Sequence, residues 1–472
     1  MSPGAGKPEE IKAELVIVGG GGAGLAAATA AAESGLKGIV VLEKRGSLGG
    51  NTARATGLFA CESPTQARNK IIADKDDLFK RAMQWAHWSR VNPRIFRAFL
   101  NKSGDTIRWL EDKGLEFQVI AFFANQDPRV EHVATGKGAQ VTATLADTCR
   151  ELGVQLLLNS SGRKLLRDAK GNVTGITAIN ETGEELEITA RSVIITTGGF
   201  GGNTELLKKY CPLYYEGMPL RGFAFTGDGL LMAEEAGAAI DDFVTMIKEG
   251  PRIELNSWPV RGLERDPCTL WVNKRGERFV DESIGAHPFE GVNAIIRQPE
   301  KICYSIIDTS IMKKMEEKIP ALEKNLQIEA GKDRIKISGS WDEIARWIGA
   351  DPAILKATID EYNTFCERGY DAVFAKDRRN LMPLTAAPFY AMKGMPTLLD
   401  TIGGIRINEH MEVLDKEEKT IPGFYAAGVA TGGWESEAYC SDLSGSAFGY
   451  AINSGRIAGE NAAEYLQGLK KK

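Results

Sequence analysis

The sequence predicts an α/β protein whose first part is built on a parallel sheet, and three observations lead to this prediction. The segment 14–18 is short, apolar and rich in β-branched residues, as buried parallel strands are. A glycine-rich turn follows at 19–24, and an alanine-rich stretch from Leu25 to Ser34 favours helix. A second apolar segment, 38–42, completes a strand–helix–strand unit, in which the two strands must be parallel.

The length and composition are those of a folded protein with more than one domain. The chain has 472 residues, of which 43% are hydrophobic and 26% are charged. A single hydrophobic core stops growing at roughly 250–300 residues, so we expect at least two domains. The net charge is -5 and the lysines and arginines are scattered, which argues against a nucleic-acid partner and against binding to an anionic membrane surface.

The N-terminal segment and the cysteines exclude further classes of protein. The segment 1–12 is polar and lacks the apolar stretch of a signal peptide, so we expect a cytoplasmic protein. No segment approaches the ~20 apolar residues that a membrane span requires. The seven cysteines stand singly, without a Cys-x-x-Cys pair, which argues against zinc ribbons, iron–sulfur clusters and a disulfide framework. We therefore expect no metal site.

The glycine-rich turn carries a dinucleotide-binding fingerprint, and each of its residues has a physical task. Gly19 permits the tight turn, Gly21 lets the backbone approach a pyrophosphate, and Gly24 lets the helix pack closely on the strand. The free N–H groups of the helix N-terminus then meet the negative charge. Glu43, directly after the second strand, is placed to accept hydrogen bonds from ribose hydroxyls, which argues against NADP. The fingerprint alone does not separate FAD from NAD.

Five later segments decide between these cofactors. They are rich in glycine and threonine and lie at 49–52, 56–57, 193–199, 226–229 and 421–428. As an ordered set they resemble the fumarate reductase/succinate dehydrogenase flavoprotein family, part of the FAD-dependent oxidoreductase 2 superfamily, which includes urocanate reductase and flavin-dependent ketosteroid dehydrogenases. The resemblance runs from about Ala13 to Leu466. It implies FAD as cofactor and a Rossmann-like FAD-binding domain with an inserted α+β capping domain.

The resemblance also assigns residues to FAD. The ADP half is expected on Gly19, Gly21, Ala23, Gly24, Glu43 and Lys44, and the isoalloxazine near Asn51, Thr52 and Gly57. The remaining contacts are expected from Thr197, Gly198, Asp228, Gly428, Val429, Ala447 and Phe448. Val429 is a departure, because the family often has Glu there. A helix that begins near 444–447 is expected to point its N–H groups at the flavin pyrimidine edge. The segment 46–50 has no His, so FAD is expected to bind noncovalently.

The resemblance divides the chain into domains. The FAD-binding domain is expected at 1–240 and 386–472, and the capping domain at 241–385, where 273–282 resembles the family's capping-domain signature. Within the cap we expect helices at 309–318 and 340–349, the second opened by a capping box on Ser340 and Glu343, and another that begins at Asp351 and Pro352. The active site is expected in the cleft between the domains, with hinge closure over the flavin.

The substrate side departs from fumarate reductases of this family. Those enzymes have His and Arg before two glycine motifs, where this chain has Asp400 and Asp442. The arginine that their cap supplies is also missing from the segment 283–287. Carboxylates facing a dianion oppose its binding, so fumarate is not the expected substrate. Asp442 and Gly445 are candidate substrate-binding residues.

Four residues are candidates for the chemistry. Tyr439 and Ser441 resemble a Tyr-x-Ser pair of some ketosteroid dehydrogenases, and the Tyr439 hydroxyl is placed either to bind a carbonyl oxygen or relay a proton, or only to pack. His287 is either a proton donor from the cap or a structural histidine. Asp400 either binds a cationic or hydroxylated substrate or bonds to nearby backbone.

These features predict hydride transfer between flavin N5 and an activated carbon–carbon bond, in the direction of enoate or enone reduction or of the reverse dehydrogenation. Partners are then a small-molecule substrate and an external electron donor or acceptor. Two alternatives stay open, an electron-transferring flavoprotein subunit of a larger complex and a flavin-binding scaffold without chemistry.

Overall fold

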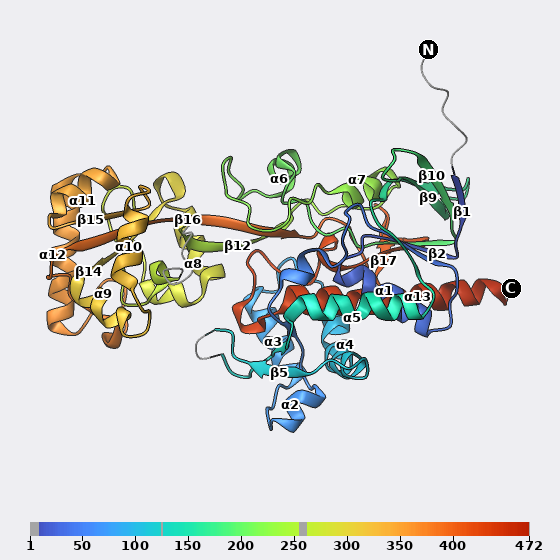
Figure 1. Ribbon diagram of the computed structural model, residues 1–472, viewed down its shortest axis with the longest axis horizontal. Coiled ribbons are helices and arrows are strands. Elements are labelled where there is room, and N and C mark those ends of the chain that lie inside the picture. The colour runs from blue at the N-terminus through green and yellow to red at the C-terminus, as the bar shows by residue number, and fades with distance from the viewer. Residues whose placement is uncertain (1–8, 124–125, 254–261, 472) are drawn as a thin grey trace, which may run out of the picture. The chain divides into compact units, whose positions relative to one another are not determined.

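The computed structural model describes residues 9–123, 126–253 and 262–471 (Figure 1). The chain forms two compact units. Unit 1 comprises Met1–Glu216, Gly222–Met246 and Asp400–Lys472, and unit 2 comprises Gly217–Arg221 and Ile247–Leu399.

The centre of unit 1 is a sheet in which the predicted strand–helix–strand unit forms. Within the described residues the sheet has six strands in the order β17-β18-β11-β2-β3-β7. The strands are β2 (Leu15–Val18), β3 (Ile39–Leu42), β7 (Gln155–Leu157), β11 (Ser192–Ile195), β17 (Glu412–Leu414) and β18 (Thr420–Ala426). All neighbours pair in parallel except β17 and β18, which are antiparallel. The predicted α/β class is confirmed.

Two helices of unit 1 pack unusually closely because small residues line their contact. These are α1 (Gly22–Glu33) and α13 (Ser446–Lys470). A Cβ on Gly455 would lie 2.2 Å from the carbonyl oxygen of Ala23, and one on Gly459 would lie 2.2 Å from that of Ala27. Backbone therefore touches backbone, which fixes the first two turns of α1 against the middle of α13.

The rest of unit 1 surrounds this centre with two small sheets and shorter helices. One sheet contains β1 (Glu9–Lys12), β8 (Ser161–Arg167), β9 (Val173–Ile179) and β10 (Glu185–Thr189), and the other contains β4 (Leu58–Phe59), β5 (Phe117–Ile120) and β6 (Glu131–Ala134). The helices are α2 (Pro64–Arg68), α3 (Lys75–Trp85), α4 (Pro93–Glu111), α5 (Lys137–Glu151), α6 (Thr204–Tyr210) and α7 (Asp228–Glu235).

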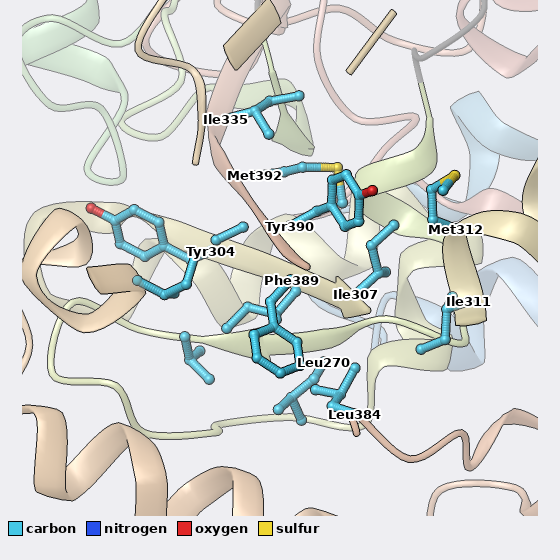
Figure 2. Packing of buried hydrophobic residues seen from close by; sticks show 14 of the residues in the cluster. Leu270, Tyr304, Ile307, Ile311, Met312, Ile335, Leu384, Phe389, Tyr390 and Met392 are labelled. Atoms are coloured by element: carbon cyan, nitrogen blue, oxygen red, sulfur yellow. The ribbon is translucent and has the colours of Figure 1, made fainter. Parts of the chain in front are cut away.

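Unit 2 has its own sheet and core. Its described strands run in the order β12-β16-β14-β13, and β15 also pairs with β16. The strands are β12 (Thr245–Arg252), β13 (Leu270–Val272), β14 (Cys303–Asp308), β15 (Ile335–Ser338) and β16 (Phe389–Ile402). The first two residues of β12 and the last three of β16 belong to unit 1. The helices are α8 (Pro288–Ile296), α9 (Thr309–Glu316), α10 (Leu322–Ala330), α11 (Trp341–Ile348) and α12 (Pro352–Arg368). Figure 2 shows part of the core, where Tyr304, Ile307, Phe389 and Met392 are buried.

The helix starts in unit 2 confirm one prediction and correct another. Asp351 caps α12 as expected, because its side chain accepts a hydrogen bond from the N–H of Ala353. The capping box at Ser340 was wrong. The Ser340 side chain makes no cap hydrogen bond, and Glu343 instead accepts one from the hydroxyl of Ser338 at 2.8 Å. Ser338 also accepts a hydrogen bond from the N–H of Ser340, so it takes over the end of the helix.

Candidate active site

The glycine-rich turn forms a cradle that has no room for side chains on the protein side. Gly19 has a φ of +113°, and a Cβ there would lie 2.5 Å from the carbonyl oxygen of Thr196. A Cβ on Gly24 would lie 1.9 Å from the carbonyl oxygen of Gly19. A Cβ on Gly21, in contrast, would meet nothing within 4 Å. The open side of the cradle is therefore at Gly21.

The first turn of α1 faces this opening without a cap. No described side chain caps its N-terminus, and its first turn holds no acidic residue. The N–H groups of Gly22, Ala23 and Gly24 precede the first intrahelical donor, Leu25, which bonds to Gly21. Such a turn is suited to bind an anion such as a pyrophosphate.

Glu43 is fixed at the end of β3. Its carboxylate is buried and accepts hydrogen bonds from the N–H of Gly20 and from the N–H of Arg45, each at 2.9 Å. Each carboxylate oxygen has a second lone pair, which is free to accept a hydrogen bond from a ligand. The contact with Gly20 ties the predicted ribose-binding residue directly to the cradle.

Lys44 and Asp228, both assigned to the cofactor from the sequence, are in contact. The Lys44 ammonium donates to Asp228 Oδ2 and to Thr226 Oγ1, both at 2.9 Å. Asp228 is the first residue of α7, so this ion pair connects the end of β3 with the start of that helix. Both side chains are about one-third exposed, which leaves them accessible to a cofactor.

A second group of predicted residues lies beside the cradle. The hydroxyl of Thr197 is buried without a hydrogen-bond partner among the described residues. Gly428 has a φ of +71°, donates its N–H to Ser454 Oγ at 2.9 Å, and a Cβ there would lie 3.0 Å from the Cβ of Ala23. Gly198 also has positive φ, at +78°. The carbonyl oxygen of Val429 accepts a hydrogen bond from the N–H of Gly403 at 3.1 Å.

Two residues of the segment expected near the isoalloxazine pack on neighbouring elements of unit 1. Thr52 covers the start of α1, because a Cβ on Gly22 would lie 2.5 Å from Thr52 Oγ1. Gly57 packs on β6, where a Cβ would lie 2.7 Å from the carbonyl oxygen of His132.

Asn51 connects this segment to Asp400. Its Nδ2 donates to Asp400 Oδ2 at 2.7 Å, and its Oδ1 accepts from the N–H of Phe223 at 3.1 Å. The N–H of Thr401 donates to Asp400 Oδ1 at 2.8 Å. Burial raises the pKa of Asp400 to about 7, although these two hydrogen bonds to the carboxylate lower it. The carboxyl is therefore poised to exchange a proton near neutrality, which is typical of functional sites.

Tyr439, a candidate for the chemistry, is hydrogen-bonded to the first turn of α13. The N–H of Ala447 donates to the hydroxyl of Tyr439 at 3.0 Å, so this N–H is already engaged by the protein. Burial raises the pKa of Tyr439 above its usual range, so the hydroxyl is protonated at neutral pH. The Ser446 side chain is buried and interacts with the Tyr439 hydroxyl through a hydrogen bond, which lowers the pKa of Tyr439 by less than burial raises it. Phe448, two positions after Ser446, is also buried.

Gly445 joins the start of α13 to β4. Its φ is +78°, its carbonyl oxygen accepts from the N–H of Phe59, and a Cβ would lie 2.9 Å from the carbonyl oxygen of Gly57. This contact brings the N-terminus of α13 to the residues that directly follow the segment expected near the flavin.

The other candidate residues differ in burial and in the unit to which they belong. The Ser441 hydroxyl is buried and lacks a hydrogen-bond partner in the described part of the chain, whereas the Asp442 side chain is exposed. His287 belongs to unit 2, where it precedes α8 and its Nδ1 lies 3.8 Å from Glu290. The structure thus brings Tyr439, Ser441 and Asp400 into unit 1 and leaves His287 in the other unit.

A family comparison identifies the cofactor. Residues 14–439 match the model of a family described as "FAD binding domain", which is most of the chain. The chain belongs to this FAD-binding family.

Relatives of this FAD-binding protein are oxidoreductases. It is 29% identical to vinyl phenol reductase of Lactiplantibacillus plantarum over 96% of each chain. It is 30% identical to fumarate reductase (cytochrome) of Shewanella frigidimarina over 96% of its own length and 77% of the relative's. A solved open conformation of a flavocytochrome c3 fumarate reductase matches 97% of this chain and 79% of that one, at 27% identity and a TM-score of 0.75. This protein is an FAD-dependent oxidoreductase of that family.

The residues present fit FAD. A bound dinucleotide would satisfy three features of the site: the open side of the cradle at Gly21, the uncapped first turn of α1 and the buried, unpartnered hydroxyl of Thr197.

Within the described residues, no helix is both long and apolar enough to cross a membrane.

Two buried acids of this FAD-binding protein were missed by the sequence reasoning. Burial raises the pKa of Glu131 to about 7, although hydrogen bonds from Ser444 and from the N–H of Gly57 lower it. Burial also raises the pKa of Glu435 to about 7, and the N–H groups of Ser436 and Cys440 donate to its carboxylate. Neither residue has a motif or spacing that marks it, because only the tertiary fold buries it.

Proposed function

We propose that this protein transfers a hydride between FAD and an activated carbon–carbon double bond of a small organic substrate other than fumarate, or catalyses the reverse dehydrogenation. Two relatives are named for their action on vinyl phenol and on fumarate, and both of these compounds contain a carbon–carbon double bond. FAD, when bound, supplies the two-electron chemistry of such a reaction. The residues of the chain then have to bind, orient and protonate the substrate.

The observation that carries the choice of substrate is the buried carboxyl of Asp400. An ionised carboxylate beside a dicarboxylate opposes its binding, and a buried site strengthens the repulsion. With burial raising its pKa to about 7, a large share of Asp400 is protonated at neutral pH. In that state it donates a hydrogen bond to a carbonyl or phenol oxygen. The proposal therefore favours a neutral or singly charged substrate.

Tyr439 is the second residue that we propose to act on the substrate. Its hydroxyl is protonated at neutral pH, because burial raises its pKa above its usual range. The hydrogen bond from the N–H of Ala447 fixes the position of the hydroxyl oxygen. A protonated hydroxyl in a fixed position is suited to stabilise an enolate oxygen or to pass a proton to the α-carbon. His287 stays the alternative proton donor.

Binding of FAD is proposed to be noncovalent, because the segment 46–50 has no histidine to attach it. The electrons have to come from, or go to, a separate donor or acceptor. Asp442 and Gly445 are proposed to contact the substrate.

Turnover with a chemical electron donor tests the proposal. The purified protein is supplied with reduced methyl viologen and with cinnamate, urocanate, 4-vinylphenol, an enone steroid or fumarate, and the saturated product is identified by mass spectrometry. We expect reduction of at least one compound other than fumarate. Fumarate as the best substrate would contradict the role given to Asp400.

A further inference from the structure

Glu131 is a buried acid that lies where three distant segments of unit 1 meet. It is 3% exposed and belongs to β6, the middle strand of the sheet β4-β6-β5, opposite Phe59 on one side and Ile120 on the other. A Cβ on Gly57 would lie 2.8 Å from Glu131 Cγ, and one on Gly445 would lie 2.9 Å from the carbonyl oxygen of Gly57. The side chain of Glu131 is therefore held in place by close packing.

The partners of Glu131 belong to the two segments that are expected at the flavin. Its carboxyl is hydrogen-bonded to the N–H of Gly57 and to the side chain of Ser444. Gly57 is one of the residues expected near the isoalloxazine, and Ser444 opens the segment 444–447, where the helix expected to face the pyrimidine edge begins. A carboxyl that is bonded to both segments is placed to respond to the charge of FAD.

No cation of the described part of the chain forms an ion pair with Glu131. Glu282, which is fully buried, shows how this protein otherwise neutralises such an acid: Arg278 donates to it at 2.8 Å, and Lys376 Nζ lies 3.0 Å away. A buried carboxyl without a cation is costly to ionise. Burial accordingly raises the pKa of Glu131 to about 7, against the two hydrogen bonds that lower it.

Tyr439 and His132 are titratable groups beside Glu131. The charge of Glu131 contributes to the raised pKa of Tyr439, which stays protonated at neutral pH. His132 follows Glu131 on β6, and burial lowers its pKa to about 4, so it stays neutral. Glu435 also acts on Tyr439, but its carboxylate is bonded to N–H groups of its own loop. Of Glu131, Tyr439 and His132, only Glu131 changes charge near neutrality.

A short series of polar side chains leads from Glu131 toward solvent. The hydroxyl of Ser444 is buried, and its Oγ lies 2.9 Å from Gln126 Nε2 and 3.1 Å from Gln126 Oε1. Gln126 is half-buried, so one hydroxyl separates the carboxyl from a side chain that solvent reaches. A hydroxyl accepts and donates hydrogen bonds at the same time. Glu131 is therefore buried and yet close to a source of protons.

We propose that Glu131 takes up a proton from solvent when FAD is reduced and releases it when FAD is reoxidised. An external donor supplies two electrons, and the flavin itself binds one proton, which leaves one negative charge on it. The second proton goes to the carboxylate of Glu131, which becomes a neutral carboxylic acid. Because like charges repel strongly in a buried site, the reduced flavin raises the proton affinity of Glu131. By linkage, an ionised Glu131 makes FAD harder to reduce.

This coupling goes beyond the proposed function and does not depend on the choice of substrate. It requires only that FAD binds next to the segments around Gly57 and Ser444. Reduction of a carbon–carbon double bond consumes a hydride and a proton, and the reduced protein holds both. Only the use of this proton in catalysis rests on the proposed function.

The potential of bound FAD as a function of pH tests the coupling without any substrate. The FAD-loaded wild type, Glu131→Gln and Glu116→Gln are titrated with dithionite and reference dyes from about pH 5 to about pH 9. Glutamine keeps the shape of Glu131 and still bonds to Gly57 and Ser444, but it carries no charge. Glu116 is the matched control, because it is exposed and directly precedes β5.

We expect the wild type and Glu131→Gln to have the same potential below about pH 6, where both side chains are neutral. Above about pH 7 the wild-type potential should fall below that of Glu131→Gln, because the ionised carboxylate opposes reduction. The control should follow the wild type throughout. Equal potentials of the wild type and Glu131→Gln at every pH would overturn the proposal. A constant difference at every pH would overturn it as well, since it would show a structural effect alone.

Proton uptake gives a second measurement. Reduced methyl viologen, which releases no proton on oxidation, reduces the flavin in weak buffer with a pH-indicator dye. Near about pH 8 the wild type should take up as much as about one proton more per flavin than Glu131→Gln. Equal uptake by the two proteins would contradict the proposal. Loss of this uptake in Glu435→Gln, with Glu131→Gln unchanged, would assign the proton to Glu435 and overturn the role of Glu131.

Ser444→Ala tests the same proposal in a protein that keeps the carboxyl. The hydrogen bond from Ser444 lowers the pKa of Glu131, so its removal should move the pH at which the potential begins to fall more steeply upward. A loss of packing alone does not move this pH. An unchanged pH dependence in Ser444→Ala would show that Glu131 is not the group that titrates with the flavin.

Discussion

Asn51 Nδ2 donates a hydrogen bond to Asp400 Oδ2 at 2.7 Å, although 349 positions of sequence separate the two residues. Asn51 follows the glycine turn at 49–50, and Asp400 lies near the end of β16. The bond therefore connects the segment expected near the isoalloxazine with Asp400, which the sequence places where fumarate reductases are expected to have a histidine. The other oxygen of Asp400, Oδ1, accepts from the N–H of Thr401 at 2.8 Å, so both carboxyl oxygens are held in place.

The raised pKa of Asp400 predicts a pH-dependent stability. The folded value of about 7 lies above the ordinary value of about 3.9, so the folded protein keeps a proton that the unfolded chain releases. The free energy of unfolding should therefore fall as pH rises from about 4 to about 7, by at most about 4 kcal/mol from this group. Denaturant unfolding of Asp400→Asn across this range should show a shallower fall than the wild type. Asp342→Asn, at an exposed position, should follow the wild type; an equal fall in Asp400→Asn would contradict the assignment.

The two glycines of the cradle should respond differently to alanine. Gly24→Ala drives a Cβ to within 1.9 Å of a carbonyl oxygen, so we expect a destabilised protein that purifies without FAD. Gly21→Ala meets nothing in the protein, so it should fold normally and bind FAD about 10-fold or more weakly. FAD fluorescence and thermal unfolding measure both effects. Gly339→Ala, where a Cβ also meets nothing within 4 Å, is the control; unchanged FAD affinity in Gly21→Ala would remove the pyrophosphate from this side of the turn.

The contact between α1 and α13 makes Gly455 intolerant of a side chain. A Cβ there would lie 2.2 Å from the backbone oxygen of Ala23, so Gly455→Ala should lower the free energy of unfolding by about 1–3 kcal/mol. Gly468→Ala, on the same helix with open space around it, should leave stability unchanged or raise it by up to about 1 kcal/mol. Equal effects of the two substitutions in denaturant unfolding would show that the close packing is not needed.

Removing the Tyr439 hydroxyl tests its proposed role. Tyr439→Phe keeps the ring but leaves the N–H of Ala447 without its acceptor. We expect kcat to fall about 10²-fold or more, as the loss of a positioned proton donor does, while the flavin spectrum is retained. Tyr370→Phe, at a 66% exposed position, should keep full activity. Wild-type turnover in Tyr439→Phe would shift the role to His287, which His287→Ala then tests.

The local part of this architecture could be predicted from the sequence. The cradle, its strand and its helix follow from adjacent residues, so the tasks given to Gly19 and Gly24 agree with the contacts found. The capping box at Ser340 failed because Ser338, two positions earlier, competes for the same carboxylate.

The long-range part could not be predicted in the same way. Partners such as Asn51 and Asp400 meet only when distant segments pack, and the raised pKa of Glu131 and Glu435 follows from burial, which no spacing encodes.

Anaerobic reoxidation of the reduced protein tests the central claim most directly. The flavin is reduced without oxygen, and its visible absorption band is followed in a stopped-flow instrument while fumarate, urocanate, cinnamate, 4-vinylphenol or an enone steroid is added. The account predicts rapid return of the band with at least one compound other than fumarate, and little with fumarate. Rapid reoxidation by fumarate would contradict the role of Asp400, and reoxidation by oxygen or artificial dyes alone would contradict hydride transfer to a carbon–carbon bond and favour an electron-transferring subunit.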